Sequence, residues 1–377
     1  MTTDSLYIGL MSGTSMDGVD GVLVRLPTDD ATPAQVLHHT AVDMPEPLRR
    51  EMMALNTSGP DELHRAALAA NALTGLYADV VLRLLDAGGL APSAVRAIGA
   101  HGQTVRHQPQ AFDGTGYTLQ LQNPSLLAER TGIDVVADFR SRDVAAGGQG
   151  APLVPAFHRR WFGRPDAAVA VLNLGGIANI SLLAAGDQGG ATTGFDCGPG
   201  NAMLDHWCQR HLGLPFDADG AWGVTGRVLP ALLADLLATP FFDQPPPRST
   251  GRDLFNPAWL EQHLARHPGA DPVDVQATLV ELTVQACAAS AISYGKDSTE
   301  LIVCGGGAFN GALMAGLARA LPGMRVQSSA PFGLPPLQVE ATAFAWLAQR
   351  WVERRPGNLP AVTGAAGPRV LGALYPA

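Results

Sequence analysis

Short apolar strands alternate with helices along all 377 residues, and this alternation predicts an α/β fold. The length of the chain is that of about two domains. An apolar strand, a turn of small residues and a second apolar strand also occur twice, at 7–24 and 169–183. The sequence therefore predicts two α/β halves that begin in the same way.

In the first half, strands are expected at 6–10 and 21–26, on either side of a turn-rich stretch. Residues 61–87 carry apolar side chains at helical spacing, which predicts a helix. Pro124 is placed at the start of another helix, since proline is favoured at that position. Further apolar runs predict strands at 95–100, 117–121 and 133–137.

The second half repeats the opening, with strands at 168–172 and 179–183 around a turn. A strand at 301–304 ends in three glycines, and a helix is expected from about Gly311. The segment 244–250 contains three successive prolines and is expected to be a loop. Long helices are expected at 275–294 and 339–352.

The charge composition excludes several function classes. Lys+Arg number 25 and Asp+Glu 34, and the only lysine is Lys296, which no glycine-rich phosphate loop precedes. A lysine-dependent phosphate loop is therefore excluded, and the net charge of −9 argues against a nucleic-acid partner. The sequence shows no secretory signal, no uninterrupted apolar run of membrane-spanning length and no CxxC pair, so we expect a cytoplasmic protein with reduced thiols and no membrane partner.

The first turn is dense in small polar residues, between two strongly apolar strands. It reads Ser12-Gly13-Thr14-Ser15-Met16-Asp17-Gly18-Val19-Asp20. Hydroxyls and backbone N–H groups bind phosphate oxygens, and Asp17 or Asp20 can hold Mg²⁺ directly or through water. Asp-Gly is also a common turn pair, so an ordinary hairpin is the alternative. The density of polar residues favours a phosphate loop.

Two more glycine-rich turns follow apolar strands in the second half. The first repeats the opening hairpin and the second joins a strand to a helix: Asn173-Leu174-Gly175-Gly176-Ile177-Ala178-Asn179 and Cys304-Gly305-Gly306-Gly307-Ala308-Phe309-Asn310. Glycine lets an anion approach the backbone, and nucleotide sites are often built at strand-to-helix turns. Ordinary tight turns are the alternative for each. Together they predict a second phosphate contact and a surface for the base or ribose.

Two charged residues suit catalysis and substrate binding. Asp196 lies in the stretch 194–201, which we interpret as a rigid Gly/Pro loop that can hold a general base, although an acid before a helix is also a common cap. Arg140 lies in an expected loop with Arg142 and Asp143, after a strand. Its planar guanidinium can hold a substrate carboxylate, and a surface ion pair is the alternative.

Other polar groups suit a sugar. His101, Gln103 and Thr104 follow a buried strand and offer several hydrogen-bonding groups, whereas a lone histidine is more often structural. Glu340 begins an otherwise apolar helix, where its carboxylate either favours the helix dipole or reaches a ligand.

Taken in order, these motifs resemble the anhydro-N-acetylmuramic acid kinase family, within the actin, Hsp70 and sugar-kinase superfamily. The matching stretches run along the whole chain, at 9–20, 101–104, 138–140, 147–152, 173–179, 195–201, 249–251, 305–307 with Asn310, and 340–341. Each is weak alone and the set is specific. Two residues depart from the family pattern: Cys197 stands where a threonine is expected, and Arg248 where a lysine is expected. Both bear on fine positioning and not on the reaction.

The resemblance implies two ribonuclease H-like domains, with ATP and Mg²⁺ in the cleft between them. The first domain is expected to comprise 1–140 plus about 353–377. The second is expected to comprise 141–352 and to carry the Gly305-Gly306-Gly307 nucleotide turn. The resemblance also implies a homodimer that works in peptidoglycan recycling.

The implied reaction opens the 1,6-anhydro ring of anhydro-N-acetylmuramic acid with water and phosphorylates O6, giving N-acetylmuramic acid 6-phosphate. Asp196 would activate the water, and Asp17 would hold the metal. The sugar contacts would be His101, Gln103, Thr104, Arg140 and Glu340. The ATP contacts would be Gly13, Thr14, Ser15, Met16, Asp17, Gly18, Val19, Asp20, Gly175, Gly176, Asn179, Gly305, Gly306, Gly307 and Asn310.

Two other functions stay open at this point. The first is another sugar or hexosamine kinase of the same superfamily, in which the aspartate would deprotonate a sugar hydroxyl. The second is an actin-like or chaperone-like ATP switch, which the sugar-type motifs and the lack of room for a peptide-binding domain disfavour.

Overall fold

The computed structural model describes residues 5–13, 16–29, 32–186, 192–251 and 254–377. The chain forms two compact units, the first Met1–Trp161 with Leu337–Ala377 and the second Phe162–Pro336. This division differs from the expected boundary near residue 140. It also places helix α11 (Val339–Val352), which was expected in the second domain, in the first unit, because α11 packs on the first sheet.

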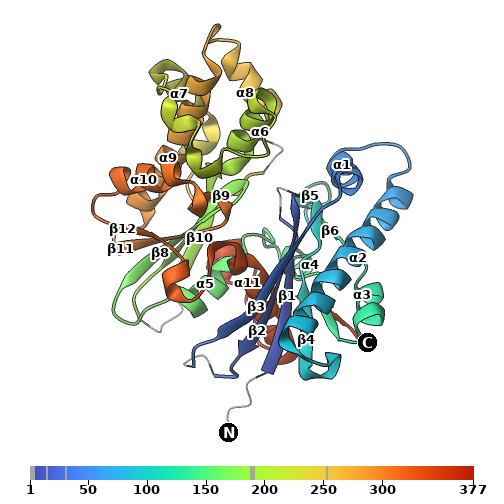
Figure 1. Ribbon diagram of the computed structural model, residues 1–377. Coiled ribbons are helices and arrows are strands. Elements are labelled where there is room, and N and C mark those ends of the chain that lie inside the picture. The colour runs from blue at the N-terminus through green and yellow to red at the C-terminus, as the bar shows by residue number, and fades with distance from the viewer. Residues whose placement is uncertain (1–4, 14–15, 30–31, 187–191, 252–253) are drawn as a thin grey trace. The chain divides into compact units, whose positions relative to one another are not determined.

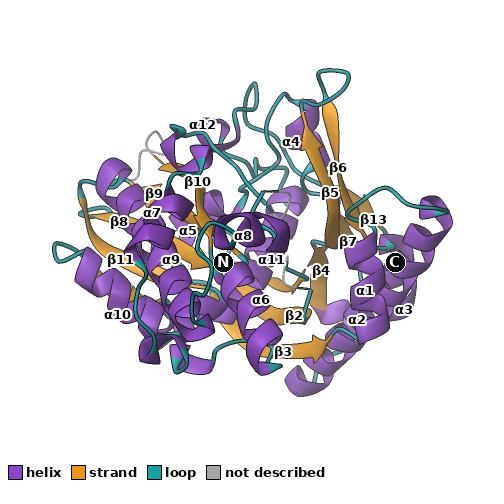
Figure 2. Ribbon diagram, turned by 90° about the horizontal axis from the view of Figure 1, so that it is seen from above, coloured by secondary structure: helices purple, strands orange, loops and turns teal. Residues whose placement is uncertain are grey.

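The first unit is built on a sheet that has six strands in the described part of the chain, in the order β13-β7-β4-β1-β2-β3. β1, β2 and β3 pair antiparallel, whereas β4 is parallel to both β1 and β7. A separate ribbon, β5–β6, stands out from this sheet (Figure 2). The strands are β1 (Ser5–Met11), β2 (Gly18–Leu26), β3 (Gln35–Asp43), β4 (Val95–Ala100), β5 (Gln103–Pro109), β6 (Gly116–Leu121), β7 (Val135–Ala137) and β13 (Ala373–Tyr375).

Helices α2 and α11 cover opposite faces of this sheet (Figure 1). Two glycines let α11 lie very close to it: a Cβ on Gly9 would stand 1.8 Å from the carbonyl oxygen of Ala341, and one on Gly99 2.0 Å from that of Phe344. The helices of this unit are α1 (Glu46–Ala54), α2 (Glu62–Gly88), α3 (Pro124–Thr131), α4 (Ser141–Ala145), α5 (Val154–Phe162, which ends one residue past the unit), α11 and α12 (Pro360–Thr363).

The second unit is built on a sheet with the order β10-β9-β8-β11-β12. β8, β9 and β10 pair antiparallel, and β11 is parallel to β8 and β12. This is the order and direction of the corresponding strands of the first sheet, so the predicted α/β class with two ribonuclease H-like halves is confirmed. The strands are β8 (Ala168–Leu174), β9 (Ile177–Leu183), β10 (Thr192–Pro199), β11 (Ser298–Cys304) and β12 (Arg325–Ser328).

In the second unit, α6, α7 and α10 pack against α9, α8 packs against α6 and α7, and α9 packs against β9 and β10 (Figure 1). They are α6 (Asn201–Leu212), α7 (Pro230–Leu237), α8 (Pro257–Leu264), α9 (Pro272–Tyr294) and α10 (Gly311–Ala320). α2 and α9 are long and apolar enough to span a membrane by length and composition alone. More than half of each apolar window is buried inside the protein, as is typical of core helices.

Two sequence expectations are corrected here. Asp196 lies on strand β10 and not in a loop, because the Gly/Pro-rich segment lies at the edge of the sheet, where such residues are tolerated. Residues 141–145 form the short helix α4 and not a loop, with Asp143 buried in it. The strands β3, β5, β12 and β13 were not predicted either.

Candidate active site

The turn between β1 and β2 is fixed from within the first unit. The Ser12 hydroxyl donates a hydrogen bond of 2.5 Å to Oε1 of Gln103, which is fully buried. Met16 has a left-handed backbone (φ 55°), and its side chain is buried, as is that of Val19. Any contact of Met16 or Val19 with a nucleotide would therefore be made by backbone atoms. Two further residues of the predicted phosphate loop, Thr14 and Ser15, lie outside the described residues.

Two carboxylates frame this turn. Asp17 is exposed, and its backbone carbonyl accepts a hydrogen bond of 2.8 Å from the N–H of Met44. Asp20 is half-buried, and its Oδ1 lies 3.1 Å from Nε2 of His39. One carboxylate oxygen of Asp20 thus has a protein partner.

His101 and Arg140 form a preorganised pair. Nε and Nη2 of Arg140 lie 3.1 and 3.0 Å from Nε2 of His101, and Nη1 donates to the carbonyl of Gly150 at 2.8 Å. Burial, and then the charge of Arg140, lower the pKa of His101 well below its usual value. His101 is therefore neutral, with Nε2 as an acceptor that fixes the arginine fork.

Two further predicted sugar contacts lie near His101. Thr104 follows it closely in the chain, and Glu340 lies on helix α11, which contacts it. Thr104, on β5, accepts a hydrogen bond of 3.3 Å from Nε2 of Gln120. Glu340 is half-buried in the first turn of α11. It is four residues before Phe344, whose ring centroid lies 4.6 Å from that of His101. Residues four apart share one helix face, so Glu340 projects on the side of α11 that faces His101.

The loop at 147–150 is held by a residue whose role was not predicted. The fully buried Asp143 accepts hydrogen bonds from the N–H of Gly150 (2.8 Å), from Nδ2 of Asn358 (2.7 Å) and from the hydroxyl of Thr363 (2.8 Å). It thus ties the loop that positions Arg140 to the C-terminal segment. No local pattern signals this link, because Asn358 and Thr363 lie more than 200 residues after Asp143.

In the second unit, the tip of the β8–β9 hairpin is bound to the start of α6. The carbonyl of Gly175 accepts from the N–H of Asn201 at 2.8 Å, and that of Gly176 from the N–H groups of Gly200 and Ala202. A Cβ on Gly200 would stand 2.3 Å from the Gly175 oxygen, so this approach requires glycine. These bonds fix the tip through its carbonyls.

The Gly305-Gly306-Gly307 turn packs against the end of the same strand. Gly305 has φ 78°, and a Cβ there would meet Oδ1 of Asn173 at 2.5 Å. Gly306 begins a short 3₁₀ helix, and Asn310 follows it. The side chain of Asn310 accepts from the N–H of Leu313 and caps α10, so its structural role is clear.

Asp196 is held on strand β10 by a neighbouring segment. Its Oδ2 accepts a hydrogen bond of 2.8 Å from the N–H of Thr250, and its own N–H donates to the carbonyl of Arg248 at 3.1 Å. It lies opposite Asn179 on β9, which lies opposite Asn173 on β8. Directly paired residues share one sheet face, so these three polar residues form a row across the sheet.

The comparisons with known proteins agree over almost the whole chain. A family model described as anhydro-N-acetylmuramic acid kinase matches residues 5–377. The protein of that name from Variovorax paradoxus (strain S110) is 62% identical over 374 residues, which cover 99% of each chain. Its counterpart from Albidiferax ferrireducens is 58% identical over 389 residues, also with 99% of each chain covered.

The chain belongs to the anhydro-N-acetylmuramic acid kinase family. It is therefore an ATP-utilising kinase that phosphorylates anhydro-N-acetylmuramic acid in cell-wall recycling, as the motifs indicated. Family membership excludes the ATP-switch alternative.

The departure at Cys197 from the family pattern has a local explanation. Cys197 is fully buried and hydrogen-bonded to Cys287 of α9, and that contact together with burial raises the pKa of Cys287. All four cysteines are free and buried. A strand turns successive side chains to opposite faces, so Cys197 contributes to the core while Asp196 faces the other way.

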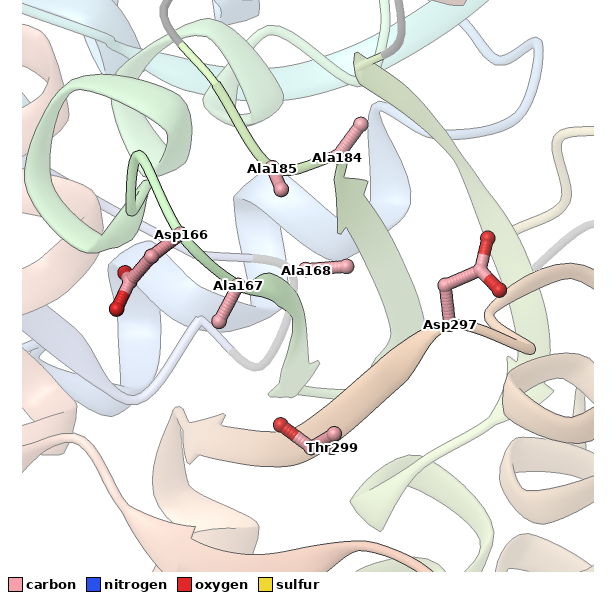
Figure 3. Close-up of a pocket in the computed structure, with 7 residues that line it drawn as sticks. All are labelled: Asp166, Ala167, Ala168, Ala184, Ala185, Asp297 and Thr299. Atoms are coloured by element: carbon pink, nitrogen blue, oxygen red, sulfur yellow. The ribbon is translucent and has the colours of Figure 1, made fainter.

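A pocket at the other end of the same strands is not part of this site. It is lined by residues next to or at the starts of β8 and β11, among them Asp166, Ala168, Asp297 and Thr299 (Figure 3). Its two carboxylates point away from each other (Figure 3). The predicted glycine-rich turns of this unit follow the opposite ends of these strands, after Leu174 of β8 and after Cys304 of β11.

Proposed function

We propose that this kinase opens the 1,6-anhydro ring of anhydro-N-acetylmuramic acid with water and transfers the γ-phosphoryl group of ATP to O6. Water attacks the anomeric carbon, the bond from that carbon to O6 breaks, and O6 attacks the γ-phosphorus as ADP leaves. The water proton passes to the carboxylate of Asp196. The product is N-acetylmuramic acid 6-phosphate.

The way in which Asp196 is held supports its role as general base. A general base must keep a fixed orientation at the reacting atom. The Thr250 N–H fixes one carboxylate oxygen at 2.8 Å, and the backbone of Asp196 is bound to Arg248 on the same strand edge. Asp196 is only 9% exposed. The fixing of its carboxylate and its backbone by these hydrogen bonds is the single observation that carries the proposal.

Arg140 suits the carboxylate of the sugar's lactyl group. Its guanidinium is already oriented by His101 and Gly150, so little conformational entropy is lost when a carboxylate binds. Neutral His101, Gln103, Thr104 and Glu340 add polar groups in the same unit. We propose that these residues bind the sugar.

Both units supply groups for ATP. We propose that residues 13–20 of the first unit and Gly175, Gly176, Asn179, Gly305, Gly306, Gly307 and Asn310 of the second contact the nucleotide. For Mg²⁺, the described residues contain no group of three or more His, Cys, Asp or Glu that could hold an ion by themselves. This fits an ion bound by phosphates, waters and one carboxylate, which Asp17 would supply. When bound, Mg²⁺ neutralises charge on the phosphates.

We further propose a cytoplasmic homodimer. The four free, buried cysteines suit a reducing compartment. Sedimentation equilibrium of the purified chain tests the dimer, and a single species of monomer mass would exclude it.

Isotope labelling tests the ring-opening step directly. The protein is incubated with ATP, the anhydro sugar and ¹⁸O-water, and the label is expected at C1 of the phosphorylated product. Unlabelled product would instead support a kinase whose aspartate deprotonates a sugar hydroxyl. Since reducing sugars exchange their anomeric oxygen with water, product from unlabelled water that is briefly exposed to ¹⁸O-water serves as the control.

Substitution of the base gives the second test. Asp196→Asn is expected to retain ATP binding, because the amide keeps the shape of the side chain, and to lower kcat by roughly 10²-fold or more. ATP binding is measured by calorimetry and turnover by coupled ADP release. Turnover like that of the wild type would sink the assignment of Asp196.

A further inference from the structure

The side chain of Arg248 donates one hydrogen bond to the peptide unit of Asp196 and three to neighbouring groups. Its Nε donates to the Asp196 carbonyl at 3.0 Å, and its Nη1 to the carbonyls of Phe242 (3.1 Å) and Gln244 (2.8 Å). Its Nη2 donates to the hydroxyl of Ser290 at 3.1 Å. One side chain thus joins three parts of the second unit: strand β10, the segment 242–244 and helix α9.

The guanidinium group of Arg248 also packs on aromatic rings. The guanidinium carbon lies 5.3 Å from the ring centroid of Phe195 and 5.1 Å from that of Phe241. Phe195 directly precedes Asp196. Stacking of a guanidinium on aromatic faces adds to its hydrogen bonds and fixes its plane.

The backbone around Arg248 completes the arrangement. β10 is the edge strand of its sheet, and Asp196 directs both its N–H and its C=O to Arg248. Two residues further on, the Thr250 N–H binds the carboxylate itself. The guanidinium therefore fixes the position of the same residue whose carboxylate the following backbone orients.

We propose that Arg248 is a positioning residue for the Asp196 general base, acting through the peptide backbone and not by contact with substrate. The proposal rests on the function proposed for Asp196. Hydrogen bonds from a charged donor are about twice as strong as neutral ones. Arginine has five donors in a planar fork, which lets it reach four acceptors at once, whereas the three donors of a lysine sit on one atom.

Three variants separate positioning from packing. Arg248→Met keeps an apolar stem against the rings of Phe195 and Phe241 but removes every donor, and it is expected to lower kcat about 100-fold, the loss typical of a displacement near 1 Å. Arg248→Lys retains a charged donor and is expected to lose no more than about tenfold. The KM for ATP is expected to change by less than about twofold in both, because neither touches the nucleotide residues. Arg319→Met, at an exposed ion pair with Glu281, is the matched control and is expected to leave kcat unchanged.

The third variant uses the space beside the arginine. A pocket lined by Phe242, Gln244, Ser290 and Tyr294 adjoins Arg248. Arg248→Ala would open the guanidinium site into this pocket. Guanidinium chloride, at a concentration too low to unfold the protein, is expected to restore kcat at least about tenfold, and sodium chloride at equal ionic strength is not.

A double variant links the effect to the base. In the Asp196→Asn background, Arg248→Met is expected to lower kcat less than about twofold further, because residues that act as one unit are not additive. Equal kcat for the Met and Lys variants, or a further 100-fold loss in the double variant, overturns the role of Arg248. If Arg248→Met neither folds nor binds ATP, Arg248→Ala is measured with and without guanidinium chloride. Failure of guanidinium to restore kcat then overturns the role of Arg248. High activity of Asp196→Asn alone would instead overturn the assignment of the base, whatever the Arg248 variants show.

Discussion

The two units share one sheet order but differ in what lies against the strands. In the first unit, the fifth residue of β1 is Gly9 and its neighbour on β4 is Gly99, and the backbone of α11 lies directly on both. In the second unit, the fifth residue of β8 is Leu172, paired with Val303, and both side chains are fully buried. One scaffold therefore accommodates a helix packed backbone to backbone and a core filled by side chains.

The polar residues differ in the same way. The first unit offers a neutral histidine and an arginine fork, groups that suit the binding of a carboxylate or a hydroxyl. The second offers a carboxylate on an edge strand, a group that suits proton transfer. The two sheets share one strand order, and their loops and edges carry different chemistry.

Gly9→Ala is expected to have the largest effect on stability. The added methyl would meet a backbone carbonyl at 1.8 Å, so α11 would have to move as a whole. We expect a loss of about 3 kcal/mol or more in the free energy of unfolding, at the upper end for overpacking. Urea unfolding followed by tryptophan fluorescence measures it. Gly323→Ala, where a Cβ would meet nothing within 4 Å, is the control, and equal midpoints for both variants would contradict this account.

Acid is expected to destabilise the first unit in particular. Burial lowers the pKa of His158 to about 3, and His101 is lowered as well. The unfolded chain takes up a proton near pH 6.5 and the folded one does not, so this stability is complete above pH 6.5 and is lost as the pH falls from 6.5 towards 3. Each histidine then costs about 1.4 kcal/mol per pH unit, or roughly 2 kcal/mol by pH 5.

The His158→Gln variant measures how much His158 alone contributes to the loss of stability in acid. Its urea midpoint is expected to fall less between pH 7 and pH 5 than that of the wild type. His64→Gln, at an exposed position on α2, serves as the control for exchanging a histidine for glutamine. An unchanged pH dependence in His158→Gln would show that His158 is protonated in the folded protein.

Arg140→Lys sharpens the contrast in function. A lysine cannot make the fork to His101 and Gly150, so the KM for the sugar is expected to rise about tenfold while the KM for ATP stays constant. The same exchange at Arg248 in the second unit is expected to act on kcat. Steady-state kinetics with each substrate varied distinguish the two, with exposed Arg142→Lys as the control. A loss confined to kcat at Arg140 would remove it from the sugar site.

The smallest effect is expected at two helix N-termini, one in each unit, which are capped in the same way. Asn123 and Asn256 each precede a proline and accept a hydrogen bond from the third residue beyond, Leu126 at 3.1 Å and Trp259 at 3.0 Å. Replacement of either by alanine is expected to cost about 1 kcal/mol. In Asn123, Nδ2 also donates to Asn71. Thermal unfolding measures the loss in each variant, and an unchanged midpoint in either one would contradict the role of that cap.

Periodic and glycine-rich segments were predictable from the sequence, while long-range partners were not. Helix α11 was predicted at its observed bounds, and the matching hairpins were predicted from their shared pattern. β10 was missed because Gly and Pro are typical of loops, and only the pairing with β9 makes that stretch a strand. The partners of Asp143 and Arg248 were likewise out of reach, since hydrogen bonds across 52 to 220 residues leave no local spacing.

The division of the chain also bears on the order in which the protein can fold during synthesis. All residues of the second unit are synthesised before α11 and β13 of the first unit. The sheet that begins at residue 5 is thus completed only when Ala373–Tyr375 have been made, after the whole of the second unit. A nascent chain would have to keep the apolar faces of β1 and β4 from aggregating until then.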